Sequence, residues 1–188
     1  MRQFLSRILY ILLCGLLTIS SYVNAGDIVL VIDRSEHRLY VKEDNQVIKQ
    51  YRAAFGVGGR GGKVQRGDGK TPLGKYKVTK IRPSQRFHLF IQLNYPSIDD
   101  ARRAFQQKFI TRNDYISVID AHITNKQPPQ HLSLGGAIGI HGIGHETERK
   151  IHIHQNIDWT EGCIALRNHE VVDLSGYIKV GTPVHIID

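Results

Sequence analysis

The stretch Gly139–Asn168 reads GIHGIGHETERKIHIHQNIDWTEGCIALRN, and both the predicted fold and the predicted chemistry depend on it. It contains Cys163, the single tryptophan Trp159 and four histidines, which are His141, His145, His152 and His154. A thiol that precedes a helix start, with an imidazole on a nearby strand, is one way of building a cysteine nucleophile. The stretch therefore predicts nucleophilic chemistry at Cys163.

A short strand, AIGIH at residues 137–141, is expected beside this thiol. Its period of two places Ile138 and Ile140 on one face, and Ala137, Gly139 and His141 on the other. The small neighbours leave room for a substrate backbone, although they equally suit a tight packing contact. His141 is thus the candidate base, with His145, His152 and His154 as alternatives, and the Gly162–Cys163 peptide is the candidate oxyanion donor.

The first 25 residues have the layout of a secretory signal peptide. Arg2 and Arg7 precede an apolar run over residues 8–19, and Val23, Asn24 and Ala25 form a small-residue cleavage site. We expect export to the periplasm or cell wall, with cleavage after Ala25. The alternative is an uncleaved membrane anchor, but the run is shorter than the roughly 20 residues that span a bilayer.

Cleavage leaves residues 26–188, a length that suits a single domain. The net charge falls from +8 to +6, because two arginines and no acid are removed. A basic exported protein suits an anionic surface such as a cell wall or lipid headgroups, and exported proteins seldom meet nucleic acid. The one remaining cysteine is a link to a partner, a working thiol or an inert core residue.

From residue 27 onward, β-branched and aromatic residues predict strands at 28–33, 38–42, 46–57, 75–81 and 89–93. Turn residues separate the first three, which indicates an antiparallel meander. Lys150–His154 also alternates and predicts a strand with Lys150, His152 and His154 facing outward. Asn168 is expected to cap a helix that runs to about residue 178, before a closing strand at 184–187.

Residues 56–74, GVGGRGGKVQRGDGKTPLG, form the most glycine-rich segment. They contain G-x-G-x-x-G, but a dinucleotide site needs a following helix, which the later glycines and Pro72 forbid. A phosphate loop fails too, because Val64 stands where its first glycine is required. We expect a mobile loop unless it borders a site, with Lys63, Arg66 and Lys70 either contacting substrate or lying at the surface.

Residues 97–132 differ in composition and predict a helical insertion packed beside the sheet, where it could cover a cleft. Asp99–Phe109 has an acidic start and a basic later part, which match the helix dipole. Asn113–Thr124 places Ile116, Ile119 and Ile123 on one helical face.

Four motifs follow one another along the chain: GDGKTPLGKY at 67–76, LNYPS at 93–97, IHG at 140–142 and TEGCIALRN at 160–168. Together with the β-rich pattern, they resemble the L,D-transpeptidase catalytic domain over about residues 28–186. The resemblance implies a mainly β fold with helices, a mixed sandwich or barrel-like architecture. It also implies a bacterial cell-wall enzyme that crosslinks peptidoglycan stem peptides without a cofactor.

In that family, a cysteine attacks the carbonyl of the L-centre of a diamino acid, expels the terminal D-alanine and passes the acyl group to an amine. The resemblance places the nucleophile at Cys163, the histidine at His141, its orienting carbonyl at Gly142 and the preceding glycine at Gly162. Three further residues are candidates for substrate contact: Thr160, Trp159 and Arg167. For Trp159 the alternative is a core anchor, and for Arg167 a surface position.

Two departures from the common pattern affect the second half of the reaction. Glu161 stands where the pattern Ser-His-Gly-Cys has histidine, and the separation of His141 from Cys163 is longer than in typical members. Asp158–Cys163 instead matches a branch with D-W-T-x-G-C, and some members of related branches cleave crosslinks or wall-anchored proteins. A hydrolase of this kind and a noncatalytic wall-binding module with an inert thiol are therefore the alternatives. An activated Cys163 should ionise below the ordinary thiol pKa of about 8.5.

A zinc cluster of the four histidines with Cys163 is the remaining possibility for this stretch. His141 and His145 have ligand spacing only on a helix, and Gly142 and Gly144 disfavour one. We therefore expect no metal, and we place His152 and His154 at the solvent or at the rim of the site.

Overall fold

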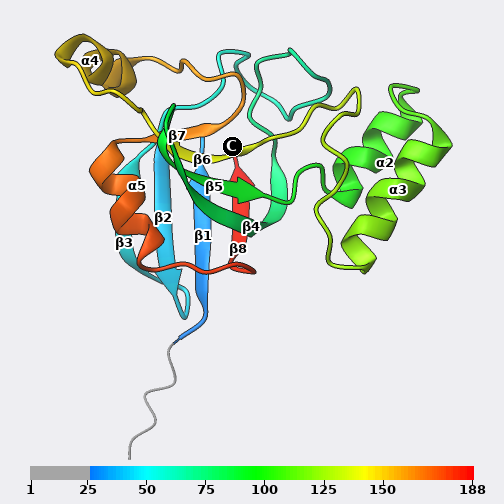
Figure 1. The fold of residues 1–188 in the computed structure, drawn as a ribbon, viewed down its shortest axis with the longest axis horizontal. Helices are drawn as coiled ribbons and strands as arrows, with labels where there is room; N and C mark the ends of the chain where they lie inside the picture. Colours follow the sequence, from blue (N-terminus) through cyan, green and yellow to red (C-terminus); the bar gives the residue numbers. More distant parts are fainter. Residues whose placement is uncertain (1–25) are drawn as a thin grey trace, which may run out of the picture.

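The computed structural model describes residues 26–188, which form eight strands and four helices (Figure 1). The predicted signal peptide, residues 1–25, lies outside the described residues. Among the helices of residues 26–188, none has the length and apolar character that crossing a bilayer requires.

The strands form one sheet in the order β3-β2-β1-β8-β4-β5-β6-β7. Their bounds are β1 Ile28–Asp33, β2 Arg38–Glu43, β3 Gln46–Arg52, β4 Gly74–Ser84, β5 His88–Leu93, β6 Gly139–Gly142, β7 Ile164–Leu166 and β8 Pro183–Ile187. The first three strands pair antiparallel, so the predicted meander is confirmed. The closing strand β8 inserts between β1, to which it is parallel, and β4.

Strand β4 belongs to both halves of the sheet. Its first residues pair with β8 and its later ones with β5, and the register shifts between Val78 and Lys80. The far end of the sheet returns toward its beginning, because Ala54, just beyond β3, pairs with Ala165 of β7. The sheet thus curves around a shared apolar core that includes Leu30, Ile32, Leu39, Ile91, Ile140 and Ile164. The predicted mainly β fold with helices is confirmed.

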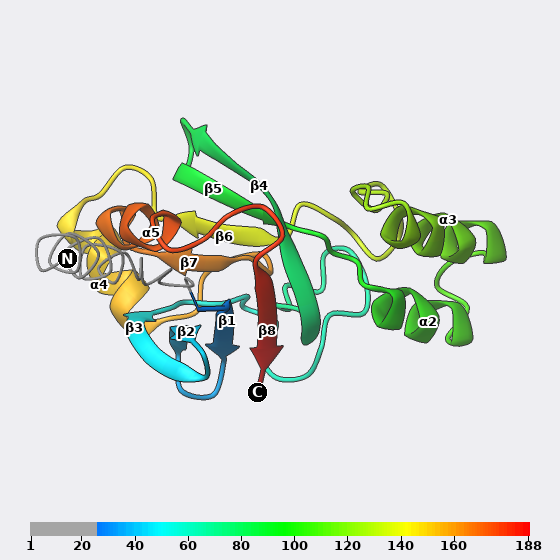
Figure 2. The same ribbon diagram turned by 90° about the horizontal axis from the view of Figure 1, so that it is seen from below.

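The helices α2 (Ile98–Gln106) and α3 (Arg112–Ile123) lie within the predicted insertion, to one side of the sheet beyond β4 (Figure 2). Each begins with a capping box, at Ser97 and at Thr111. They share a second small core of Ala101, Ala104, Ile110, Val118, Leu132 and Leu134. Because Val118 and Ala121 are the buried residues of α3, the face that carries Ile116 and Ile123 is turned to solvent.

One local prediction is wrong. Residues 150–154 lie inside a helix, α4 (Glu148–Asn156), instead of a strand. Its N-cap Thr147 accepts a hydrogen bond from the N–H of Lys150, and Glu148 occupies the first turn, both of which favour a helix. The helix expected from Asn168 is confirmed as α5 (Asn168–Ser175), although its N-cap is Arg167 and it ends at Ser175 instead of about residue 178. Strand β7 lies between Cys163 and this helix.

Candidate active site

Strands β6 and β7 bring His141 and Cys163 to one face of the sheet. The two strands are parallel, and Ile140 lies opposite Ile164. Cys163 directly precedes β7, so it lies beside Gly139 and on the same face as His141. Both isoleucines point to the other face, into the core.

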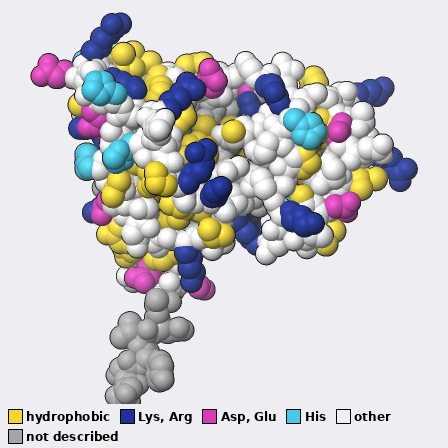
Figure 3. Space-filling view, in the orientation of Figure 1, with side chains coloured by type: hydrophobic (Ala, Val, Ile, Leu, Met, Phe, Trp, Pro, Cys, Tyr) yellow, Lys and Arg dark blue, Asp and Glu magenta, His cyan; other side chains and the backbone are white. Residues whose placement is uncertain are grey.

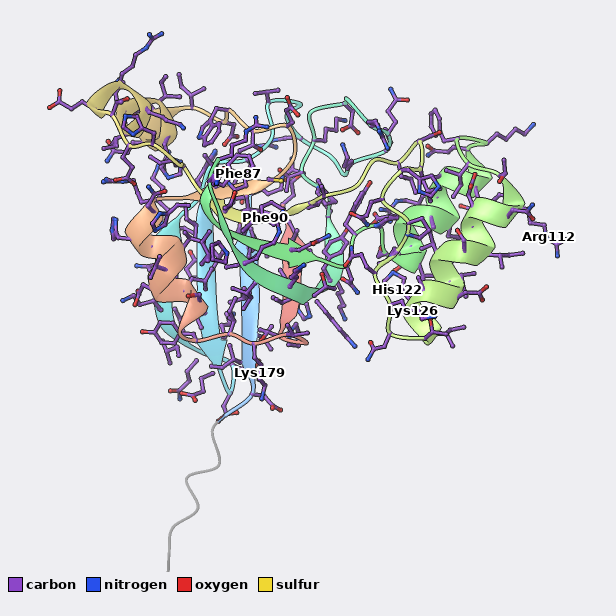
Figure 4. All side chains as sticks on the ribbon, viewed as in Figure 1. Phe87, Phe90, Arg112, His122, Lys126 and Lys179 are labelled. Atoms are coloured by element: carbon purple, nitrogen blue, oxygen red, sulfur yellow. The ribbon has the colours of Figure 1, made fainter. Side chains whose placement is uncertain are left out.

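The imidazole of His141 is held in one tautomer. Its Nδ1 lies 2.8 Å from the carbonyl oxygen of Gly142. Since that oxygen can only accept, Nδ1 carries the proton and Nε2 keeps its lone pair. Three rings surround the imidazole: Phe87 at a centroid distance of 4.1 Å, Phe90 stacked at 6.2 Å and Trp159 edge-on at 6.1 Å. Figure 4 labels Phe87 and Phe90, which lie near each other.

Enclosure by these rings determines the charge of His141. Only 2% of the residue is exposed, and burial lowers the pKa of His141 to about 4. The hydrogen bond to Gly142 opposes this shift but is the weaker effect. The imidazole is therefore neutral at pH 7 and able to accept a proton through Nε2.

The thiol of Cys163 lies against bare backbone. Its Sγ donates a hydrogen bond to the carbonyl oxygen of Ala137 at 3.4 Å. Burial raises the pKa of Cys163 to about 11, although the backbone of Gly139 and the charge of Lys63 act in the opposite direction. Loss of hydration thus outweighs the nearby cations, which is the opposite of the lowered pKa expected for an activated thiol.

Gly139 is required for this arrangement. A Cβ at Gly139 would lie 2.5 Å from the carbonyl oxygen of Ile91 and 2.7 Å from the ring of Phe90. A side chain at this position would displace either the neighbouring strand or the ring that stacks on His141. The close approach of Phe90 to His141 therefore depends on a residue without a side chain at position 139.

The turn before the nucleophile is shaped by Thr160 and Gly162. The buried Oγ1 of Thr160 donates to the carbonyl oxygen of Cys163 at 2.7 Å and accepts from the N–H of Gly162 at 3.1 Å. Gly162 has a φ of +127°, and a Cβ there would lie 2.6 Å from the carbonyl oxygen of Lys70. The N–H of Cys163 makes no hydrogen bond to another residue of the described part and can serve an oxyanion.

Asp158 connects this turn by hydrogen bonds to the segment that follows β3, at the opposite edge of the sheet. Its carboxylate accepts a hydrogen bond from the N–H of Phe55 at 2.8 Å and lies 3.2 Å from Nε2 of His37. The backbone continues the connection, because the N–H of Thr160 donates to the carbonyl oxygen of Phe55 at 2.9 Å. The aspartate and threonine of the D-W-T-x-G-C motif are thus used to position the cysteine.

The glycine-rich loop, residues 56–74, borders the site. Asp68 accepts hydrogen bonds from Nζ of Lys63 at 2.7 Å and from the N–H groups of residues 64, 65 and 70. Arg66 donates to the carbonyl oxygens of Gln130 and Leu132, both at 3.3 Å, and so ties the loop to the insertion. Lys63 and Arg66 are therefore engaged by the protein itself.

Arg167, a candidate for contacting substrate, is also paired within the protein. Its guanidinium donates to both carboxylate oxygens of Glu146 at 3.2 Å, and Glu146 accepts from the N–H of Asn168 at 3.0 Å. Asn168 in turn exchanges two hydrogen bonds with the backbone of Gly144. The start of α5 thus holds the loop that follows β6. The sequence gives no sign that Glu146 has a structural role, because its hydrogen-bonding partners Arg167 and Asn168 lie about twenty residues further along the chain.

Trp159 connects His141 to α4 instead of anchoring the main core. The indole is half-buried, and its Nε1 donates to Nδ1 of His154 at 3.4 Å. His154 is 2% exposed, which contradicts its predicted place at the solvent or the rim, and burial lowers its pKa to about 4. The cause is the helix, which turns His154 inward while a strand would have turned it out.

The other two histidines do not join the pair. His145 and His152 are both exposed. Within residues 26–188, no three His, Cys, Asp or Glu side chains gather in a way that could hold a metal ion. The arrangement as described is a thiol, a neutral imidazole and a free backbone N–H, which are the groups that acyl transfer requires.

Comparison with known proteins places the chain in a family. The family profile of the L,D-transpeptidase catalytic domain, YkuD, matches residues 27–186. The chain belongs to this family. The putative L,D-transpeptidase YafK of Escherichia coli (strain K12) is 30% identical over 93 residues, which are 47% of this chain and 38% of that protein. The matched segment thus spans well under half the length of that curated relative.

Solved structures share the fold of this L,D-transpeptidase domain. Bd1075 of Bdellovibrio bacteriovorus has a TM-score of 0.55 and 24% identity over 90% of this chain and 51% of its own. The helical cell shape determining protein Pgp2 of Campylobacter jejuni has a TM-score of 0.54 and 19% identity over 89% and 49%. An L,D-transpeptidase of Xylanimonas cellulosilytica has a TM-score of 0.51 and 16% identity over 88% and 62%. At these identities the likeness concerns the fold alone.

Proposed function

We propose that this protein is an exported peptidoglycan L,D-transpeptidase in which Cys163 is the nucleophile and His141 the general base. The observation that carries the proposal is the shared sheet face of the two residues, together with the Gly142 carbonyl that leaves Nε2 of His141 free to accept. Membership of the L,D-transpeptidase family supplies the reaction class. The substrate is the peptidoglycan stem peptide, and the location is the periplasm or cell wall.

The raised pKa of Cys163 and the lowered pKa of His141 favour a neutral thiol beside a neutral imidazole. In the first half of the reaction, Nε2 of His141 takes the proton of Sγ as Sγ bonds to the stem-peptide carbonyl carbon. The oxyanion that forms accepts a hydrogen bond from the N–H of Cys163. The C–N bond to the terminal D-alanine then breaks, and the departing nitrogen receives the proton from Nε2.

In the second half, an amine of another stem attacks the thioester carbon. Its proton passes to Nε2 of His141, the C–S bond breaks, and Sγ of Cys163 recovers the proton. Glu161 lies exposed on the turn, and its charge is one of the groups that raise the pKa of Cys163. Through such crosslinks the enzyme contributes to wall organisation and cell shape.

Purified peptidoglycan incubated with the full chain tests this proposal. We expect new crosslinks, released D-alanine and an acyl-enzyme on Cys163 that is visible by mass spectrometry. Cys163→Ala should abolish all three, because the nucleophile has no substitute. His141→Ala should lower turnover about 100-fold or more. His145→Ala is the matched control, since this exposed histidine follows the same strand, and its effect should be mild.

Each alternative predicts a different product. Loss of existing crosslinks, or release of a wall-linked protein, would identify a hydrolase with the same nucleophile. Binding to the wall without an acyl-enzyme would identify a noncatalytic module. Turnover retained in Cys163→Ala would refute the mechanism outright.

A further inference from the structure

Lys63, in the glycine-rich loop, is a buried lysine. Only 4% of the residue is exposed, whereas many lysine and arginine side chains stand out from the surface, as the dark-blue atoms in Figure 3 show. A buried ammonium is stable only when it is paired and hydrogen-bonded. Nζ of Lys63 meets this requirement, because it donates to Oδ1 of Asp68 at 2.7 Å and to the carbonyl oxygen of Gln65 at 3.0 Å.

Asp68 is the other half of this buried pair. Its side chain is 8% exposed, and its carboxylate also accepts hydrogen bonds from the backbone N–H groups of residues 64, 65 and 70. Burial raises the pKa of Asp68, but these hydrogen bonds, with that of Lys63 foremost, lower it to about 2. Asp68 is therefore charged at pH 7 and fixes the loop backbone on both sides of itself.

The Lys63 side of the pair contacts segment 135–137, which holds the thiol of Cys163. The Lys63 stem lies against Gly135, where an added Cβ would be 3.4 Å from its Cε. Two residues further along, the carbonyl oxygen of Ala137 accepts the hydrogen bond from Sγ of Cys163. The Lys63 side chain thus borders the segment that fixes the direction of the thiol.

The Asp68 side of the pair contacts the turn before the nucleophile. The N–H of Lys70 donates to Asp68, and the carbonyl oxygen of Lys70 lies 2.6 Å from the position of a Cβ at Gly162. Gly162 directly precedes Cys163, so the turn lies on backbone that the carboxylate holds. The pair therefore connects the two segments that position Cys163.

The charge of Lys63 also reaches the thiol. Burial has the largest effect on the pKa of Cys163, which it raises, but Lys63 has the largest effect of any charged side chain and lowers it. The other charged groups that act on Cys163 are Glu161, which raises this pKa, and Arg86, which lowers it. Both are exposed, so solvent and salt screen them more than they screen Lys63.

We propose that Lys63, held by Asp68, is a positioning residue for acyl transfer at Cys163, an inference that rests on the proposed function. By joining segment 135–137 to the turn at Gly162, the pair keeps Sγ in place for the substrate carbonyl. Misplacement of a reacting group by about 1 Å can cost about 100-fold in rate. The ammonium also favours the negative charge that develops at Sγ as its proton leaves.

Lys63→Met tests this role, because methionine keeps an apolar stem and removes the charge. The measurement is acyl-enzyme formation on Cys163 with a synthetic stem peptide, followed by mass spectrometry as a function of peptide concentration. We expect the maximal rate to fall about 10- to 100-fold with little change in the half-saturating concentration, since positioning acts after the peptide is bound. Lys63→Arg, which retains the charge, should restore much of the rate.

Two further variants separate positioning from the cost of an unpaired buried charge. Lys63→Met combined with Asp68→Asn removes both charges, and it should lose no more rate than Lys63→Met alone, because the two residues act as one unit. Lys49→Met is the matched control, since it also removes a lysine from an ion pair, which Lys49 forms with Asp173 at 2.8 Å between β3 and α5. Its maximal rate should be unchanged. Circular dichroism of each variant checks that the fold is retained.

The resting thiol gives a readout that a purely structural role would not move. In the full chain carrying Cys14→Ser, Cys163 is the only thiol, and its labelling by iodoacetamide is measured against pH. Lys63→Met should shift the midpoint of this profile to higher pH, because a positive charge that lowers the thiol pKa is lost. The midpoint should stay in place in Lys63→Arg and in Lys49→Met.

Three outcomes would overturn the proposal: an unchanged maximal rate in folded Lys63→Met, an unchanged labelling midpoint, or an equal loss of rate in Lys49→Met. If Lys63→Met does not fold, the double variant decides by the same two readouts. The labelling assay needs no turnover. A shifted midpoint in a protein whose unsubstituted form makes no acyl-enzyme would support the role of Lys63 at the thiol and reject the proposed function.

Discussion

The reactivity of the Cys163 thiol between pH 5 and pH 11 most directly tests the inference that Cys163 and His141 are both uncharged at pH 7. The thiol has a pKa of about 11, whereas an ordinary cysteine has about 8.5. At pH 7 the thiolate fraction is then about 300-fold lower than in an ordinary cysteine. A more basic thiolate is about tenfold more nucleophilic, given a Brønsted slope of about 0.4 to 0.5. We therefore expect alkylation roughly 20- to 30-fold slower than for an unfolded cysteine.

The assay is the rate of iodoacetamide labelling, followed by mass spectrometry. The full chain should carry Cys14→Ser so that Cys163 is its only thiol. The same chain unfolded in guanidinium chloride provides the reference at each pH. The folded rate should keep rising to about pH 10 or beyond, because the thiolate fraction is still increasing there.

The pH at which the labelling rate reaches half its maximum reports the thiol pKa. Restricted access of the reagent lowers the rate at every pH by the same factor and leaves this midpoint unchanged. A rate that levels off near pH 6, or that exceeds the unfolded reference at pH 7, would show a thiolate stabilised by an imidazolium. That result would refute both the neutral pair and the general-base role that we derive from it.

Three further predictions concern the surroundings of the pair. As the pH falls from about 6.5 to about 4, the unfolded chain binds a proton at His154 that the folded chain does not, so His154 should contribute up to about 3 kcal/mol to the drop in the free energy of unfolding, beside a similar contribution from His141. Urea denaturation at several pH values should show this drop, and His154→Gln should reduce it; an unchanged profile would contradict burial as its cause. Gly139→Ala should cost about 1–3 kcal/mol and lower kcat/KM, because its Cβ would lie 2.5 Å from the Ile91 carbonyl oxygen, and a variant with unaltered Tm would argue against that contact. Glu146→Gln should weaken the pair with Arg167 at a cost of about 0.5–1 kcal/mol, measured by urea denaturation, with a control at high salt in which the difference narrows.

The hydrophobic period predicted the secondary structure correctly where it was compatible with only one type of element. The alternation in residues 28–33 and 38–42 lies between turn residues, and those strands occur with nearly the predicted bounds. The alternation over residues 150–154 covers too few residues to exclude a helix. The N-cap at Thr147 favours the helix that the structure has there. Strand β7 has only three residues and was missed, because it becomes a strand by pairing with β6, which lies more than twenty residues earlier.

The sequence by itself determined the membership of the family and marked Cys163 and His141 as the candidate catalytic pair. Those conclusions depend on residue order and on strand period, which are local properties of the chain. Only the tertiary structure decided the charge states of the pair, because burial results from segments far apart in sequence that meet around it. It likewise decided that Arg167 is bound by Glu146 and that Lys63 lies against Gly135. Side-chain partners across such distances follow from packing, and no local pattern records them.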